Sequence, residues 1–155
     1  MVAISKAVVP QLRQSHYAAR RPVESDEWID KRRGCAALLE RHHTSGDLDL
    51  TGQFPVLSFL ENLSYLARRG AIDKMMVWNK FGWITVGYYY ALTRPKNALV
   101  AIRDKEKDST LYEEFEWLFR ESVRIYRSKG VMVDHSDSID DRIRQLINWE
   151  SSLKR

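Results

Sequence analysis

The sequence has a single cysteine, no long apolar run and no strong excess of charge of one sign. Cys35, alone among 155 residues, excludes an internal disulfide framework and a zinc site built from several thiolates. Its apolar helical position favours a buried structural thiol. The longest apolar run, residues 81–92, has twelve residues, whereas a membrane-spanning helix needs about 20. We therefore expect no transmembrane segment, and a cytoplasmic protein.

Strand patterns, internal repeats and low-complexity segments are also missing. Apolar and polar residues alternate over no useful length. Apolar side chains instead recur every three or four residues, which is typical of amphipathic helices. A length of 155 residues suits one domain. The sequence thus predicts an all-α, single-domain bundle of about five to seven helices, built around an antiparallel helical hairpin.

The predicted helices have clear start and stop signals. Pro55 suits a first helical turn, and Gly70 suits a helix end because glycine adopts the left-handed cap conformation without steric cost. Ser25 and Asp73 carry side chains that cap helix N-termini. Helices are expected at about residues 25–44, 55–69, 74–94, 97–105, 110–128 and 138–153.

The helix expected after Asp73 is apolar on nearly every side, which predicts that it lies at the centre of the bundle. Gly82 and Gly87 within it each cost about 1 kcal/mol of helix stability against alanine. We expect the close approach of a neighbouring helix to compensate for this cost at both positions.

Two stretches carry a characteristic pattern, FLENLSYLARRGAIDKMMVWNKFG at residues 59–82 and LYEEFEWL at residues 111–118. Over roughly residues 25–128 the chain resembles the bacterial helical family known as domain of unknown function 4760. The resemblance implies an all-α fold and a bacterial or phage source, and it supplies no activity and no catalytic residues. Many members carry membrane-spanning helices before this domain, and this sequence shows none. We expect a basic segment at residues 1–24 before the family-like core and an amphipathic helix at residues 137–154 after it.

Two small groups of side chains resemble metal ligands. They are His42 and His43 with Asp47 and Asp49, and Asp134, His135 and Asp137. Adjacent helical histidines point about 100° apart, so the first group favours the basic end of a helix. The second group lacks the alternate oxygen ligands and the turn glycine of a calcium loop. We predict no metal and no cofactor.

A polar stripe on the helix after Pro55 is the best candidate for ligand binding. Glu61, Tyr65 and Arg68 lie four and three residues apart, hence on one helical face, and Arg69 follows. One interpretation is a site for a small ligand or anion, or an enzyme site. The other is a hydrogen-bonded ion pair that fixes the hairpin. No nucleophile or phosphate-binding glycine loop accompanies the stripe.

Basic residues gather near the N-terminus, although 25 basic and 21 acidic residues give the whole chain a net charge of only +4. The candidates for contact with phosphates are Arg13, Arg20, Arg21, Arg32 and Arg33. They form either a solvated face or a surface that binds nucleic acid or anionic lipid in a salt-dependent way.

The last predicted helix has an apolar stripe formed by Ile139, Ile143, Leu146 and Ile147. Such a stripe covers the domain's own core or docks to a partner or a second copy of the chain.

The leading functional hypothesis is a non-enzymatic bacterial interaction or regulatory domain that acts through a protein partner or through self-association. It rests on the absence of a catalytic constellation in the sequence and on the aromatic-rich helical segment at residues 54–126. The alternatives are nucleic-acid or lipid binding through the basic N-terminal face, and a ligand or enzyme site at the polar stripe.

Overall fold

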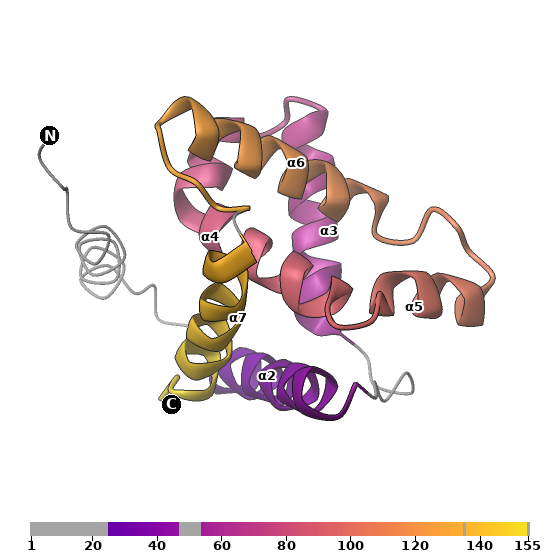
Figure 1. Ribbon diagram of the computed structural model, residues 1–155. Helices are drawn as coiled ribbons and strands as arrows, with labels where there is room; N and C mark the ends of the chain where they lie inside the picture. Colours follow the sequence, from indigo (N-terminus) through magenta and orange to yellow (C-terminus); the bar gives the residue numbers. More distant parts are fainter. Residues whose placement is uncertain (1–24, 47–53, 135, 155) are drawn as a thin grey trace, which may run out of the picture.

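The computed structural model describes residues 25–46, 54–134 and 136–154, and within these ranges every regular element is an α-helix. Figure 1 shows the arrangement, which confirms the predicted all-α bundle. The helices are α2 (Asp26–Ser45), α3 (Pro55–Arg68), α4 (Lys74–Thr93), α5 (Ala98–Glu106), α6 (Glu113–Ser128) and α7 (Ser136–Ser151).

The predicted capping residues begin and end these helices. The side chain of Ser25 accepts a hydrogen bond from the N–H of Trp28, and that of Asp73 accepts one from the N–H of Met76 at 2.7 Å. Gly70, just after α3, has a φ of 71°. Because L-residues rarely adopt this conformation, the glycine allows the chain to turn sharply from α3 into α4.

The helix expected from residue 110 starts later, because Asp108 organises a turn ahead of it. The Asp108 carboxylate accepts hydrogen bonds from the N–H and the hydroxyl of Thr110. Tyr112 then has a left-handed φ of 63°, and α6 begins at the following residue.

Helix α4 is the centre of the bundle, as predicted, because it packs against α2, α3, α5, α6 and α7. Helix α6 covers α3 and α4 on one side, and α7 packs on α4 and α2 on the other (Figure 1). Figure 1 also shows α5 projecting from the side of the bundle.

The two glycines of α4 lack a side chain for different structural reasons. A Cβ added to Gly87 would lie 3.2 Å from the side chain of Leu146, so α7 does approach closely there. The same expectation is wrong for Gly82, where an added Cβ would meet the indole of Trp78 on the same helix at 2.6 Å. Gly82 leaves room for a large side chain one turn earlier, and not for a neighbouring helix.

None of the helices in the described ranges is both long and apolar enough to cross a bilayer.

Candidate functional site

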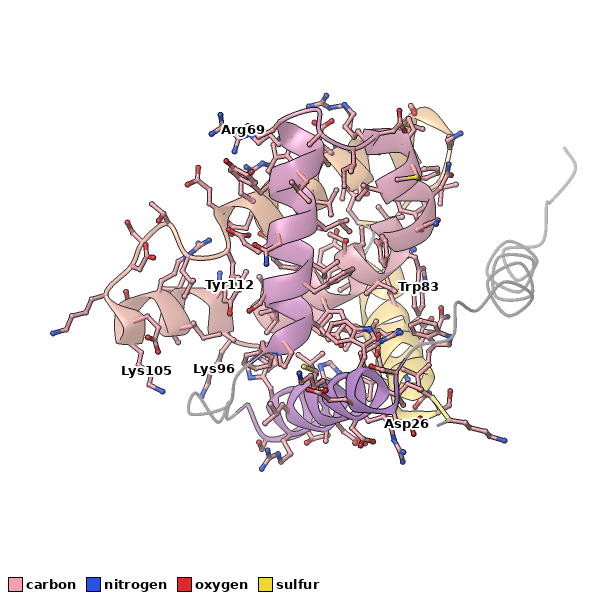
Figure 2. The ribbon with its side chains drawn as sticks, turned by 180° about the vertical axis from the view of Figure 1, so that it is seen from behind. Asp26, Arg69, Trp83, Lys96, Lys105 and Tyr112 are labelled. Atoms are coloured by element: carbon pink, nitrogen blue, oxygen red, sulfur yellow. The ribbon has the colours of Figure 1, made fainter. Side chains whose placement is uncertain are left out.

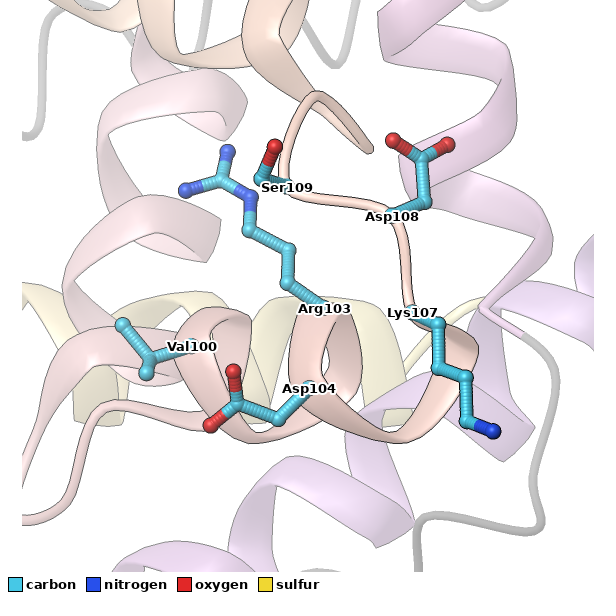
Figure 3. A pocket seen from close by; sticks show the side chains of 6 residues that line it. All are labelled: Val100, Arg103, Asp104, Lys107, Asp108 and Ser109. Atoms are coloured by element: carbon cyan, nitrogen blue, oxygen red, sulfur yellow. The ribbon is translucent and has the colours of Figure 1, made fainter.

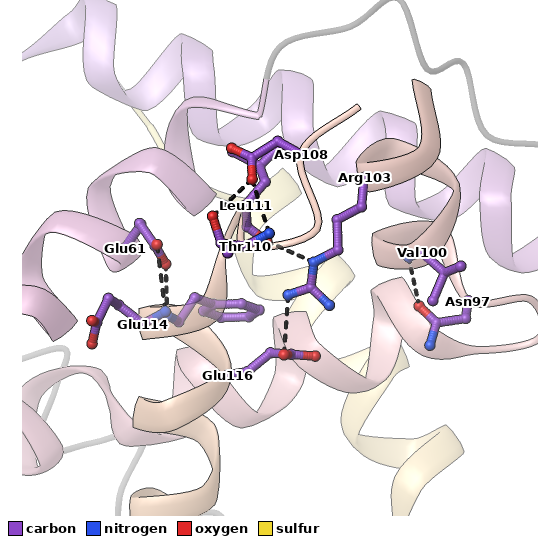
Figure 4. Close-up of polar contacts among 10 residues, drawn as sticks. Glu61, Asn97, Val100, Arg103, Asp108, Thr110, Leu111, Glu114 and Glu116 are labelled. Carbon is purple, nitrogen blue, oxygen red and sulfur yellow. Dashed lines mark hydrogen bonds and ion pairs between the residues drawn. The ribbon is translucent and has the colours of Figure 1, made fainter. Parts of the chain in front are cut away.

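The α3 face predicted to bind a ligand holds the N-terminus of α6. Oε2 of Glu61 accepts a hydrogen bond from the N–H of Phe115 at 2.7 Å, and Oε1 accepts a longer one from the N–H of Glu114 at 3.4 Å. Helix α6 has no side-chain cap of its own, since Tyr112 precedes it. Glu61 therefore caps α6 from another helix, where a carboxylate also favours the helix dipole (Figure 4).

This capping carboxylate is half-buried, and its burial raises the pKa of Glu61 above the usual value. The hydrogen bonds from the two backbone N–H groups act in the opposite direction and do not fully offset the loss of hydration.

The other members of the predicted stripe have separate partners. Arg68 lies 3.2 Å from a carboxylate oxygen of Glu114 on α6. The guanidinium of Arg69 stands 5.2 Å from the ring centroid of Tyr65, a distance suited to a cation–π contact. The second interpretation, a hydrogen-bonded ion pair that fixes the hairpin, differs from these contacts, because Glu61 and Arg68 each bond to α6 and hold that helix against α3. Ligand binding by these residues stays a prediction, because the observed contacts are explained without a ligand.

Arg103 is a second polar anchor, and it comes from the charged run at residues 103–108. Its Nε donates to the carbonyl of Leu111 at 2.7 Å, and its Nη2 pairs with Glu116 at 3.0 Å (Figure 4). These bonds tie the α5–α6 turn to the first turns of α6. The sequence gives no signal for them, because the run has the composition of a solvated loop.

Burial removes one arginine, Arg32, from the surface predicted to bind phosphates. Arg32 is only 5% exposed and cannot contact a polyanion in this fold. Arg33 is exposed, as that prediction requires. Arg13, Arg20 and Arg21 lie outside the described residues, so phosphate binding by them remains a prediction.

Arg32 is half of a buried ion pair between α2 and α7. Its Nε and Nη2 bond to the two carboxylate oxygens of Glu150 at 2.9 and 3.0 Å, in the two-pronged geometry that suits a guanidinium and a carboxylate. The guanidinium also stands 4.6 Å from the ring centroid of Trp149. The wrong prediction for Arg32 has a simple cause. The sequence does not show whether an arginine on a helix is buried or exposed, because this depends on a carboxylate partner that is distant in sequence.

Two other titratable groups lie near this pair, in the core. Burial raises the pKa of Cys35 to about 11 and that of Tyr88 well above its ordinary value. Both groups are therefore protonated at neutral pH. A thiol of this kind is a poor nucleophile, which agrees with the prediction that Cys35 is structural.

His42 is buried at the end of α2, and its Nε2 lies 3.1 Å from the backbone carbonyl of Lys96. A carbonyl oxygen only accepts hydrogen bonds, so Nε2 carries the proton and donates it. Burial lowers the pKa of His42. Across the described residues, no three histidine, cysteine, aspartate or glutamate side chains are grouped so that they could hold a metal ion.

The apolar stripe of α7 belongs to the chain's own core. Ile139, Ile143, Leu146 and Ile147 are all buried and join the main hydrophobic cluster with residues of α2, α3, α4 and α6. Their assignment as an interface for a partner is wrong, because the folded chain covers them. The alternative, in which α7 covers the core, is confirmed.

A concavity of about 350 Å³ lies between α5 and the turn that follows it (Figure 3). It is lined by Val100, Arg103, Asp104, Lys107, Asp108 and Ser109. Arg103 and Asp108 are already engaged by the turn, as described above. The concavity is therefore chiefly a product of the turn's own structure.

A second concavity, of about 500 Å³, lies along α6 beside α4 and the segment that leads to α7. It is lined by Tyr90, Phe119, Arg120, Val123, Arg124, Arg127 and Asp134, and we call it the arginine groove. Neither concavity includes a residue of the predicted ligand stripe.

Comparison with known proteins gives one match, to a family model. Residues 54–122 match the family described as Domain of unknown function (DUF4760). No curated protein and no solved structure is similar enough to match the chain. The DUF4760 match confirms the resemblance seen in the sequence, and it spans the segment from Phe54 into α6. It includes Glu61 and the α6 N-terminus that Glu61 caps, and it leaves out α2, α7 and their buried ion pair.

Proposed function

We propose that this chain is a bacterial, cytoplasmic, non-enzymatic interaction domain that binds a protein partner through the α3–α4 hairpin. One observation carries the proposal. Among the described residues, seven large apolar side chains are exposed, and five of them lie on these two helices. The five are Phe59, Tyr65, Leu66, Met75 and Met76, and we call them the hairpin surface. Exposed apolar groups gathered on one element mark interaction sites.

The hairpin surface combines a rigid part with an adaptable one. The ring of Phe59 is held between Trp28 and Phe81, with centroid distances of 5.3 and 5.4 Å. Met75 and Met76 have flexible, polarisable side chains that adjust to the shape of a partner. A fixed aromatic anchor on the same hairpin as adaptable side chains suits the apolar face of a partner helix.

The charge around this surface favours a partner of a different sequence over a second copy. Of the acidic residues of the hairpin, Glu61 caps α6 and Asp73 caps α4. Arg69 and Lys80 are exposed. Two copies facing each other would bring like charges together, so the partner we propose is an acidic amphipathic segment of another protein.

The test places a photo-crosslinking residue at Leu66 in one variant and at Met132 in another, in living cells. Met132 is the matched control, because it is 65% exposed and lies outside the hairpin. We expect a partner that crosslinks from position 66 only. The purified partner should then bind Leu66→Asp at least about tenfold more weakly than the native chain, and Met132→Asp equally well.

Two results would contradict the proposal. One is the same set of crosslinks from both positions, which would mean that the hairpin surface selects nothing. The other is crosslinking of position 66 to a second copy of the chain, with a dimer in sedimentation that Leu66→Asp abolishes.

A further inference from the structure

We propose that the arginine groove binds the phosphate group of a small organic phosphate. This site is separate from the hairpin surface and does not depend on the protein-binding proposal.

The three arginines of the groove lie on one face of α6. Arg120, Arg124 and Arg127 are spaced by four and three residues, so their side chains emerge along one line. The first and last are separated by about 10 Å along the helix axis. The concavity is open to solvent, and its volume of about 500 Å³ is large enough to hold a small organic phosphate. It is too short for an extended polymer, which would need a longer track of charge.

Arginine is the side chain best suited to phosphate, because its planar guanidinium bonds two oxygens at once. Every cationic side chain that lines this groove is an arginine. Two more, Arg94 and Arg142, lie near Tyr90, since their charges lower its pKa against the larger, opposite effect of burial. The charge of Asp134 acts on the pKa of Tyr90 in the opposite direction, so arginines outnumber acidic side chains around this residue.

The acidic groups near the groove leave cationic capacity unused. Arg127 pairs with Asp134, and Arg124 pairs with Glu121, which also binds Lys74 at 2.8 Å. Arg120 is exposed and has no acidic partner among the described residues. Its neighbour one turn earlier, Glu116, is taken by Arg103. An incoming dianion would therefore meet one arginine that is not neutralised and a second whose carboxylate is shared.

The rest of the groove is apolar, which indicates a phosphate carried on an organic body. Tyr90, Phe119 and Val123 line it together with the three arginines and Asp134. Phe119 is held in place by stacking on Tyr89 at a centroid distance of 3.6 Å. Tyr90 and Val123 are each only 8% exposed, so the half-buried Phe119 supplies most of the apolar contact area that a base or a hydrocarbon group would use.

The experiment titrates the purified chain by calorimetry with adenosine monophosphate, ribose 5-phosphate, inorganic phosphate and adenosine, at low and moderate salt. We expect adenosine monophosphate or ribose 5-phosphate to bind more tightly than inorganic phosphate, and adenosine not to bind. The two organic phosphates show whether the apolar part of the groove accepts a base or a sugar. Binding should weaken as salt rises.

Variants connect the binding to this groove. Arg120→Ala and Arg124→Ala should each weaken binding of the better organic phosphate about tenfold, which corresponds to about 1.4 kcal/mol. Arg144→Ala is the matched control, because Arg144 is an exposed arginine on α7 outside the groove, and it should bind as the native chain does. Both groove arginines are exposed, so their loss should leave the thermal unfolding temperature nearly unchanged.

Three results would overturn the proposal. The first is the absence of binding by any of the three phosphates. The second is binding that Arg120→Ala and Arg124→Ala leave intact. The third is tighter binding of a short polyglutamate peptide than of either organic phosphate, since this would assign the groove to acidic protein segments.

Discussion

Glu61 shows how a polar residue can resemble a functional site and yet stabilise the fold. Its carboxylate replaces the missing side-chain cap of α6, and Arg68 on the same face pairs with Glu114 in the first turn of that helix. Both residues fall in the segment that matches DUF4760. Their shared task is to hold the α6 N-terminus against α3, the kind of contact that fixes one helix relative to another.

We predict a distinctive pH dependence for this cap. Replacing Glu61 by alanine should lower the free energy of unfolding by about 1 kcal/mol or more, because two N–H groups lose their acceptor. The pKa of Glu61 is raised in the folded state, so folding favours the protonated carboxyl. Its contribution to stability is therefore fully present below the unfolded-state pKa and declines as pH rises through the folded-state pKa.

Urea unfolding of the native chain and of Glu61→Gln at several pH values between 4 and 7 measures this effect. The native chain's advantage over Glu61→Gln should be largest at the acidic end and smaller at neutral pH. An advantage that grew toward neutral pH would mean that the carboxylate, and not the protonated acid, is favoured by folding.

At the scale of elements, α4 decides the architecture, because all the other described helices pack on it. Its apolar residues point in every direction, so it has no face left for solvent along most of its length. Gly87 marks the closest approach in this packing, where α7 reaches the backbone of α4 through Leu146. The exposed Gly34 of α2 offers a contrast, since an added Cβ there would meet nothing within 4 Å.

We predict that replacement by alanine has opposite effects on stability at Gly34 and at Gly87. Gly34→Ala should stabilise the chain by up to about 1 kcal/mol, because alanine is the better helix former and the site is open. Gly87→Ala should gain the same helix propensity and lose more, because its new methyl would press on Leu146 at 3.2 Å. Thermal unfolding of both variants checks the pair. Stabilisation by Gly87→Ala would show that α7 shifts freely to make room.

At the scale of the whole molecule, the Arg32–Glu150 pair joins parts of the chain that are 118 residues apart in sequence. It links α2 to α7, two helices that lie outside the DUF4760 match and pack against each other. The pair is almost fully shielded from water, and α7 supplies core residues as well. The ends of the described fold are thus held together by both apolar and ionic contacts.

Breaking this pair from one side should cost far more than removing it altogether. Arg32→Ala should lower the free energy of unfolding by about 3–5 kcal/mol, because the buried carboxylate of Glu150 would lose its two-pronged guanidinium partner. The double variant Arg32→Met with Glu150→Met should lose much less, since it restores apolar packing of similar volume. Denaturant unfolding of the single and double variants provides the cycle. Equal losses in both would show that the charges themselves add little.

The positions of the helices follow from local sequence signals, apart from the late start of α6 at Glu113. The signals that start and stop helices act within a few residues, as at Ser25, Gly70 and Asp73, and so does the spacing of apolar side chains. These signals can therefore be recognised in the sequence without knowing which distant residues they contact. The same local pattern predicted that α4 would be central, because a helix with no polar face has to be surrounded. The same apolar spacing also separated the helices that supply the core from the loops between them.

The roles of the polar residues depend on the packing of helices that are distant in sequence. Arg32, a candidate surface cation in the sequence, is buried because it pairs with the carboxylate of Glu150. Glu61 caps α6 because the N-terminus of that helix has no side-chain cap of its own. The arginine groove likewise exists only because Tyr90 of α4 and the arginines of α6 line one concavity. The role of a charged or polar side chain depends on the group that it contacts, and in these cases that group comes from a distant part of the chain.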